Sequence, residues 1–124
     1  MYNLFCFVVF LLFSVMNVYV HSYISRNSYY LIRRMMISNN ISHLLKNKIE
    51  KMVCYNYISL ALYESIKIKN MYKIKLKSKT QKEINAIAID SLIDGVKKYD
   101  WKNDHHILTP YIKKYIRSYL IDNI

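Results

Sequence analysis

The scarcity of glycine and proline is the sequence feature that most constrains the fold of this chain. Among 124 residues there is one Gly and one Pro. Tight turns between strands rely on these residues, because glycine reaches positive φ and proline presets φ for a turn. The composition therefore disfavours a turn-rich β fold. We predict an all-α protein, and the length allows at most one small domain.

Apolar residues recur at helical spacing in the middle of the chain, between residues 42 and 68. This periodicity predicts one or two helices there. The apolar positions are Leu45, Ile49, Met52 or Val53, Tyr57, Ile58, Leu60 or Ala61, and Ile66.

A different pattern follows, because lysines alternate with Ile74, Leu76 and Ser78 between residues 73 and 79. An alternation of this kind fits a strand. No neighbouring strand is evident in the sequence, so we interpret the segment as a basic connector exposed to solvent. The alternative is an arm whose lysines meet nucleic-acid phosphates and release counterions.

The sequence predicts a helical hairpin at the carboxyl end. Thr80 and Glu83 form a capping box, which opens a helix that ends near Tyr99. After a polar loop, Thr109 and Pro110 fit the N-cap and first turn of a second helix. The first helix places Ile84, Ile87 or Ala88, Leu92, Val96 and Tyr99 on one side, and the second places Tyr111, Ile112, Tyr115, Ile116, Tyr119 and Leu120 on one broad stripe.

This hairpin is too small to fold alone, because two helices of about 40 residues bury little surface. We expect it to pack on the helices of residues 42–68, to pack on another protein, or to remain marginally stable. The helical part is thus a small, possibly incomplete bundle.

An uncharged apolar segment spans residues 4–20 and is followed by His21, Ser22 and Tyr23. Its length lies between that of a signal-peptide core and that of a membrane span. We expect an N-terminal apolar helix over residues 1–22 that acts as a signal peptide cleaved after Ser22. The alternative is an uncleaved membrane anchor, which would be the chain's contact with a membrane.

Charge divides the rest of the chain into two segments. Residues 23–82 carry thirteen Lys and Arg against two acids, Glu50 and Glu64, whereas residues 83–124 carry six of each sign. A basic, acid-poor segment behind a signal peptide has the composition of a bipartite leader, as in proteins sent to an apicomplexan plastid. We therefore divide the chain into a leader (1–22), a basic transit-peptide-like or helical linker segment (23–79) and a helical unit (80–124).

The carboxyl-terminal residues resemble part of region 2 of bacterial-type RNA polymerase sigma factors of the sigma-70 family. The resemblance rests on Leu92–Asp100, read L-I-D-G-V-K-K-Y-D, and on residues 108–124, where Tyr111, the pair Ile116-Arg117 and the pair Ile121-Asp122 keep their order. It covers about a quarter of the chain. The chain departs from the family at Glu83–Ala88, where the polar contact residues are replaced, and at Lys114, where the family has an aromatic residue. We expect a truncated or degenerate relative.

The resemblance implies two partners, the RNA polymerase core and promoter DNA. It implies that Leu92, Ile93 and Val96 contact polymerase. It also implies that Tyr111 and Tyr115 stack on melted bases, while Lys113, Lys114 and Arg117 contact phosphates. The function implied is a transcription initiation factor in an organelle. The alternative is a small basic secreted or membrane-anchored helical protein with a structural or interaction role.

Other chemistry finds little support in the sequence. Asp104, His105 and His106 lack a further ligand at metal-binding spacing, so we predict no metal and no cofactor. Asp90 and Asp94 are one helical turn apart, but we expect both to face solvent, and we predict no enzymatic activity. Cys54 has no disulfide partner once the leader is removed, so we expect it to act as a packing residue.

Overall fold

A computed structural model describes residues 24–102 and 107–123 of the chain. Within these ranges the structure is helical, with no strand, which confirms the predicted all-α class. None of these helices is long and apolar enough to cross a membrane. The predicted apolar helix of residues 1–22 and the residues Asp104, His105 and His106 lie outside the described ranges. The helices are α2 (Arg26–Met36), α3 (His43–Met71), α4 (Gln81–Lys98) and α5 (Leu108–Asn123).

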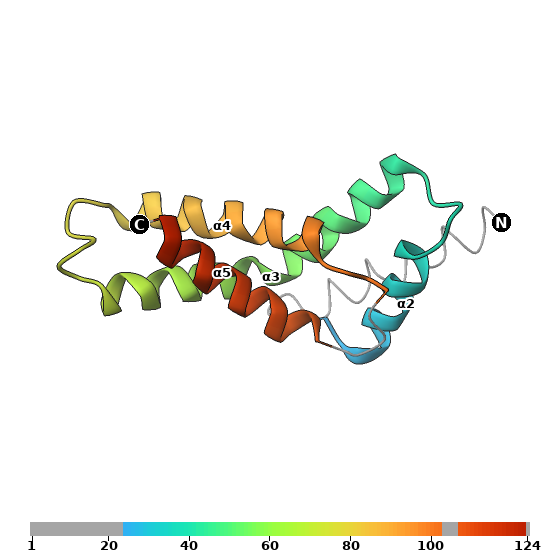
Figure 1. The fold of residues 1–124 in the computed structure, drawn as a ribbon, viewed down its shortest axis with the longest axis horizontal. Coiled ribbons are helices and arrows are strands. Elements are labelled where there is room, and N and C mark those ends of the chain that lie inside the picture. The colour runs from blue at the N-terminus through green and yellow to red at the C-terminus, as the bar shows by residue number, and fades with distance from the viewer. Residues whose placement is uncertain (1–23, 103–106, 124) are drawn as a thin grey trace.

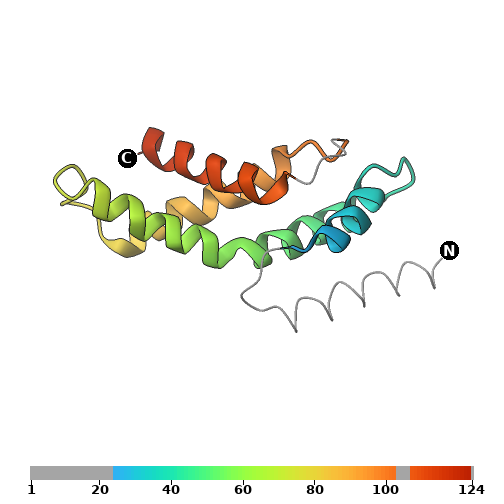
Figure 2. The same cartoon turned by 90° about the horizontal axis from the view of Figure 1, so that it is seen from below.

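The longest helix, α3, runs along the molecule, and α4 and α5 lie along it (Figures 1 and 2). Helices α3, α4 and α5 each contact the other two. The carboxyl-terminal hairpin therefore packs on the middle helix of the same chain, which is the first of the alternatives that the sequence left open. The one or two helices expected over residues 42–68 form one helix.

Side-chain caps begin the first three described helices. Ser25, Ser42 and Thr80 each accept a hydrogen bond from the backbone N–H three residues later, which pairs an amide that the helix itself leaves free. Thr80 accepts from the Glu83 amide at 3.2 Å, as the capping box predicts. Helix α4 ends at Lys98, with Tyr99 as its C-cap, also as predicted.

The start of α5 differs from the prediction. The helix begins at Leu108, and the Ile107 carbonyl accepts from the Tyr111 amide at 3.0 Å, so Thr109 lies inside the first turn. The Thr109 hydroxyl lies 2.6 Å from the Tyr57 hydroxyl on α3. Thr109 therefore bonds to a neighbouring helix instead of capping its own.

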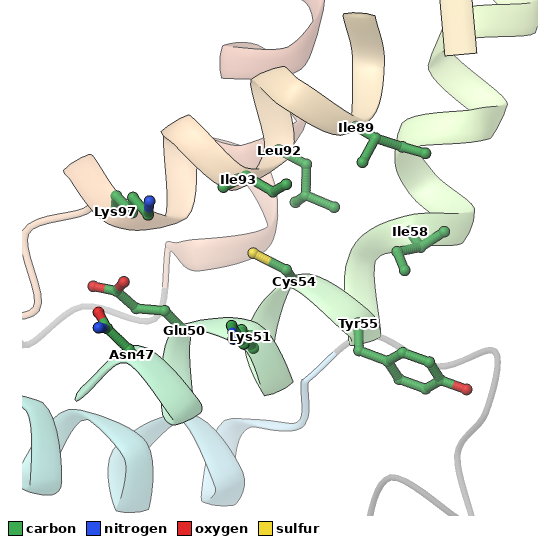
Figure 3. A pocket seen from close by; sticks show the side chains of 10 residues that line it. All are labelled: Asn47, Glu50, Lys51, Cys54, Tyr55, Ile58, Ile89, Leu92, Ile93 and Lys97. Carbon is green, nitrogen blue, oxygen red and sulfur yellow. The ribbon is translucent and has the colours of Figure 1, made fainter. Parts of the chain in front are cut away.

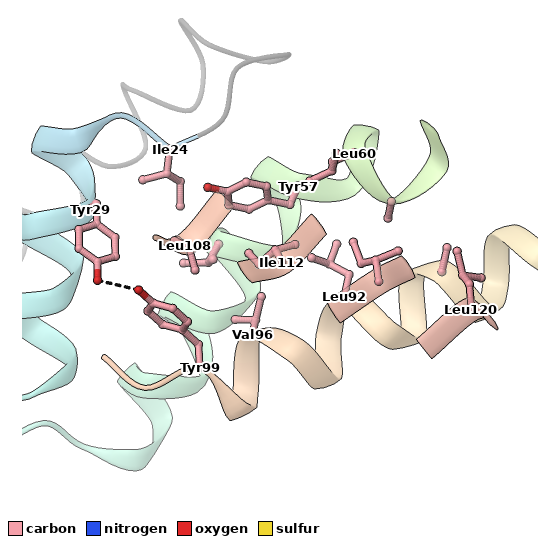
Figure 4. Packing of buried hydrophobic residues seen from close by; sticks show 14 of the residues in the cluster. Ile24, Tyr29, Tyr57, Leu60, Leu92, Val96, Tyr99, Leu108, Ile112 and Leu120 are labelled. Atoms are coloured by element: carbon pink, nitrogen blue, oxygen red, sulfur yellow. Dashed lines mark hydrogen bonds between the residues drawn. The ribbon is translucent and has the colours of Figure 1, made fainter. Parts of the chain in front are cut away.

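The core fills the space between α3, α4 and α5. Helix α5 contributes Leu108, Ile112, Ile116 and Leu120, which are fully buried at intervals of four residues. They meet a buried row of α4 and the middle of α3 (Figure 4). Burial of this stripe is the main force that holds α5 in place, because each such side chain contributes about 1.5–3 kcal/mol when removed from water.

Helix α2 was not predicted as a helix, and aromatic contacts hold it at one end of the bundle. The hydroxyl of the buried Tyr29 lies 2.7 Å from that of Tyr99 (Figure 4). The Tyr29 ring stacks on Trp101 with centroids 5.8 Å apart. Arg33 donates from Nη2 to the Lys102 carbonyl at 2.9 Å. The expected basic segment of residues 23–79 therefore contributes both α2 and α3 to the same core as residues 80–124.

The alternating lysine segment forms turns rather than a strand. The Leu76 amide donates to the Tyr72 carbonyl at 2.9 Å, and the Lys79 amide donates to the Leu76 carbonyl at 3.0 Å. Leu76 is 1% exposed, whereas Ile74, two residues earlier, is 93% exposed. One apolar side chain thus fixes the turn on the bundle while the other points into solvent.

This pair predicts a sharp difference in stability between two similar substitutions. Leu76→Ala should lower the free energy of unfolding by about 2–5 kcal/mol, because it removes buried methyl groups and leaves a cavity. Ile74→Ala is the matched control and should change stability by less than about 0.5 kcal/mol. Urea denaturation followed by circular dichroism measures both, and equal losses would contradict the placement of the turn.

Candidate functional site

Three tyrosines form a row along α5. Tyr111, Tyr115 and Tyr119 are spaced by four residues, and each side chain is partly exposed. Their ring centroids are 5.9 Å and 6.4 Å apart along the row. The Tyr99 ring continues the row toward α2, with its centroid 5.0 Å from that of Tyr111. The aromatic positions expected to stack on bases are therefore neither sealed in the core nor fully exposed.

Hydroxyl groups tie this row to α4. Tyr111 donates to the Gly95 carbonyl at 3.0 Å. Tyr115 donates to the Asp94 carboxylate. A Cβ added at Gly95 would lie 2.8 Å from Cδ1 of Tyr115, so the glycine is what lets the ring approach the helix so closely. Gly95 costs α4 about 1 kcal/mol of helix propensity relative to alanine, and the close ring contact is the physical reason for its presence.

Asp94 is the polar centre of this α4–α5 contact. Its hydrogen bond from Tyr115, and then its contact with Lys98, lower the pKa of the Asp94 carboxyl. The same Tyr115–Asp94 bond raises the pKa of Tyr115. Lys98 Nζ lies 3.1 Å from the Asp94 carboxylate, which raises the pKa of Lys98. Asp90 is exposed and Asp94 is partly exposed, in keeping with the expectation that both face solvent, and Asp94 additionally bonds to Tyr115 of α5.

On its other flank, α5 carries an ion pair with a buried acid. Arg117 Nε donates to Glu64 Oε2 at 2.7 Å. The Glu64 side chain is fully buried on α3, and its second oxygen, Oε1, has no hydrogen-bond partner within the described residues. The Glu64 hydrogen bond raises the pKa of Arg117. Arg117 thus compensates a buried carboxylate.

The residues expected to bind DNA therefore do not form one surface. Tyr115 contacts α4, whereas Arg117 contacts α3, so the two side chains lie on opposite flanks of α5. Lys113 is one turn before Arg117 on the α3 flank. Lys113 and Lys114 are both exposed. Of the three expected cations, only Lys114 directly precedes a row tyrosine, and Arg117 is engaged in the bundle instead of being free for phosphate.

A groove of about 400 Å³ lies between α3 and α4, on a face of α4 different from the tyrosine row (Figure 3). Its walls are largely apolar, and charged side chains from both helices stand at its rim. Such a concave apolar surface with polar edges is typical of a site that accepts an apolar side chain from a partner. The lining residues are Asn47, Glu50, Lys51, Cys54, Tyr55, Ile58, Ile89, Leu92, Ile93 and Lys97.

The expected polymerase-binding residues are placed unequally by the fold. Leu92 and Val96 are fully buried in the core, although Leu92 also lines the groove. Ile93 is 40% exposed and lines the groove. Helical periodicity brings Leu92 and Val96 to one side, and the packing of α4 between two helices turns that side inward. Sequence reasoning missed Ile89, which reaches the groove one turn before Ile93.

Cys54 lies at the inner wall of the groove as a partly buried free thiol. Burial, together with the nearby Glu50 charge, raises the pKa of Cys54 to about 11. The thiol is therefore neutral at physiological pH, which fits the packing role expected from the sequence. Within the described residues no three His, Cys, Asp or Glu side chains gather closely enough to hold a metal ion.

The Glu64–Arg117 pair gives a prediction for stability. Arg117→Met should lower the free energy of unfolding by about 3 kcal/mol, the lower end of the usual range for breaking a buried pair, because Arg117 itself is 37% exposed. The double variant Glu64→Leu/Arg117→Met should recover most of that loss, since no charge remains buried. Lys113→Met is the matched control and should leave stability within about 0.5 kcal/mol. A double variant that is no more stable than Arg117→Met alone would contradict the pairing.

The raised pKa of Cys54 gives a prediction for pH dependence. The measurement uses a full chain carrying Cys6→Ser, so that Cys54 is the thiol that reacts. In the folded protein the rate of Cys54 alkylation by iodoacetamide should still rise with pH up to pH 10. In urea, where the chain is unfolded, the rate should level off near the ordinary pKa of 9.0. At pH 8 the native rate should be about tenfold lower, since the greater nucleophilicity of the more basic thiolate partly offsets its smaller population. Because the folded pKa is the higher one, the stability from this group is fully present below pH 9.0 and is lost toward pH 11. Coincident profiles would rule out a buried thiol.

The two candidate surfaces share α4 as their common support. The tyrosine row reaches α4 through Asp94 and Gly95, and the groove reaches it through Ile89 and Ile93.

Comparisons with protein-family models, with curated proteins and with solved structures find no match to this chain.

Proposed function

We propose that this chain is a sigma-like transcription initiation protein that engages RNA polymerase and promoter DNA. The observation that carries the proposal is the placement of the tyrosine row at the bundle surface, where each residue is partly exposed and the hydroxyls of Tyr111 and Tyr115 are bonded to α4. Stacking on a base uses the face of a ring, so a ring anchored by its hydroxyl is already oriented for that contact. The resemblance of Leu92–Asp100 and of residues 108–124 to sigma region 2 supplies the functional class.

The proposed DNA contact uses Tyr111 and Tyr115, with Lys114 beside them as the phosphate contact. Lys113 is exposed on the other flank and contributes to the general attraction of DNA. Arg117 acts indirectly in this proposal, because its bond to Glu64 holds α5 in position. Neutralisation of phosphates by these lysines makes binding weaken as salt rises.

The proposed polymerase contact is the groove between α3 and α4. Ile93 and Ile89 offer apolar surface there, the exposed Lys51 and Lys97 offer positive charge, and the largely buried Glu50 also lines the groove. An apolar groove with such edges suits an amphipathic helix of a partner. Within this proposal the chain reaches an organelle through the leader of residues 1–22 and the basic composition behind it, and α3 stays in the mature protein because it forms one wall of the groove.

A second candidate function is an interaction protein without nucleic acid. Arg117 is paired with Glu64, and Lys98 is paired with Asp94 beside the row. Within the described residues, Lys114 is then the cation nearest to Tyr115 in sequence that is not in an ion pair. These pairings favour a protein that uses the groove for a protein partner, either secreted or anchored at a membrane. The two functions differ in whether the tyrosine row binds DNA.

Binding to melted DNA tests the proposal directly. The double variant Tyr111→Leu/Tyr115→Leu should weaken binding to a fluorescent A·T-rich oligonucleotide with an unpaired segment by at least about tenfold, because each stacked base contributes about 1–3 kcal/mol. The matched control is Tyr55→Leu/Tyr63→Leu, which removes two exposed tyrosines of α3. Tyr115→Phe keeps the ring but removes the hydroxyl that orients it, so it should weaken binding less than the double variant does. Fluorescence anisotropy gives the dissociation constants, and equal losses in both double variants would reject the tyrosine row as the DNA contact.

Capture of a bacterial-type polymerase core tests the groove. Ile93→Asp should abolish co-purification, whereas Ile66→Asp, which changes another exposed isoleucine on α3, should not. If the unmodified chain recovers no polymerase and binds no melted DNA, the sigma-like function is wrong and the interaction protein without nucleic acid is favoured.

A further inference from the structure

The turn between α3 and α4 combines dense positive charge with exposed apolar side chains. Residues 65–82 contain seven lysines and no acid. We name residues 71–79 the lysine turn, since most of these lysines lie in it or next to it. The lysines are Lys67, Lys69, Lys73, Lys75, Lys77, Lys79 and Lys82.

Ile74 is the apolar tip of the lysine turn. Its side chain is 93% exposed and Met71 is 63% exposed, although an isoleucine is normally among the most buried residues. The turn is fixed to the bundle by Leu76, which is buried, and by the backbone bonds on either side of it. The exposure of Ile74 therefore serves no packing purpose within the described part of the chain.

The lysine turn stands at the end of the molecule away from α2, and both views place it at the tip (Figures 1 and 2). Lys79 Nζ donates to the Asn123 carbonyl at 3.5 Å, which links the turn to the end of α5. A projecting tip of this kind can reach a flat surface without a clash from the rest of the bundle.

The chemistry of the lysine turn favours a lipid surface over nucleic acid. Phosphates of nucleic acid would account for the lysines but give Ile74 and Met71 no apolar environment. A bilayer with anionic headgroups meets both needs, because lysines stay at the headgroups while apolar side chains enter the hydrocarbon boundary. Tyr72, which is partly exposed beside them, is of a residue type that suits the membrane–water interface.

We propose that the lysine turn docks this protein peripherally on anionic membrane surfaces, with Ile74 and Met71 inserted at the headgroup boundary. This contact is separate from the tyrosine row and the groove, and it needs no membrane-spanning helix. It also differs from any contact made by residues 4–20, because the lysine turn requires anionic lipid.

The test places a fluorescent reporter at the tip of the full chain. With vesicles of equal parts phosphatidylserine and phosphatidylcholine, the tryptophan emission of Ile74→Trp should shift to the blue. Lipids brominated in the acyl chains should quench that emission. With phosphatidylcholine alone it should show neither. Leu44→Trp is the matched control, since Leu44 is also exposed but begins α3 far from the turn, and its emission should not change. Trp101 is buried and gives both variants the same background.

Charge is tested in the Ile74→Trp chain by changing Lys73, Lys75 and Lys77 to Gln. Vesicle binding through the tip should fall on the order of 100-fold, since each lysine near an anionic surface strengthens binding about fivefold. The same change at Lys46, Lys48 and Lys51 removes equal charge elsewhere and should have a much smaller effect.

Three outcomes would overturn the lipid proposal. The first is unchanged Ile74→Trp emission with anionic vesicles. The second is an equal shift with neutral vesicles, which would mean that the leader alone brings the chain to the bilayer. The third is a shift with an oligonucleotide but not with vesicles, which would identify nucleic acid as the partner. None of these measurements depends on polymerase or promoter binding, so failure here is distinct from failure of the sigma-like function.

Discussion

The ion pair between Glu64 and Arg117 sets the position of α5 on α3. A carboxylate buried without compensation is strongly unfavourable, so the bundle is less stable whenever Arg117 does not reach Glu64. The apolar stripe of α5 supplies most of the burial, but apolar packing alone allows a helix to rotate or slide by small amounts. The charged bond at 2.7 Å favours one of these positions, and it directs the Arg117 flank of α5 toward α3.

That arrangement has a direct consequence for the tyrosine row. With Arg117 directed to α3, the opposite flank of α5 presents Tyr111 and Tyr115 to Gly95 and Asp94 of α4. The absence of a side chain at Gly95 allows close approach, and the hydroxyl bonds then fix the ring edges. The hydrogen bonds that pack the two tyrosines on α4 are therefore also the bonds that orient their rings in the proposed DNA contact.

Much of the fold follows from the sequence, and the failures have physical causes. Periodicity and the Thr80 cap predict α4 because both signals are local. Helix α2 has local signals in the Ser25 N-cap and in the spacing of Tyr29, Ile32 and Met36, which the predicted elements do not include. Its place in the bundle could not be predicted, because Tyr99 and Trp101, the partners of Tyr29, lie some 70 residues away. In the sequence Glu64 stands out only as one of two acids in a basic segment. It falls, however, at the helical spacing of Tyr57, Leu60 and Ile68, where a buried residue is expected. An acid at such a position is the signal that would have predicted a buried pair.

The same limit applies to the candidate site. A broad stripe on a helix shows that residues share a side, but it does not show which of them meet another helix and which stay at the edge. Leu92 and Ile93 are adjacent and both line the groove, yet Leu92 is fully buried whereas Ile93 is exposed, because α4 is packed by α3 and α5 together. Resemblance over a quarter of the chain transfers positions without this distinction. Ile116 and Arg117, which carry part of the resemblance, are explained by burial and by the bond to Glu64. The functional part of the resemblance therefore rests on Tyr111 and Tyr115, which the packing leaves partly exposed.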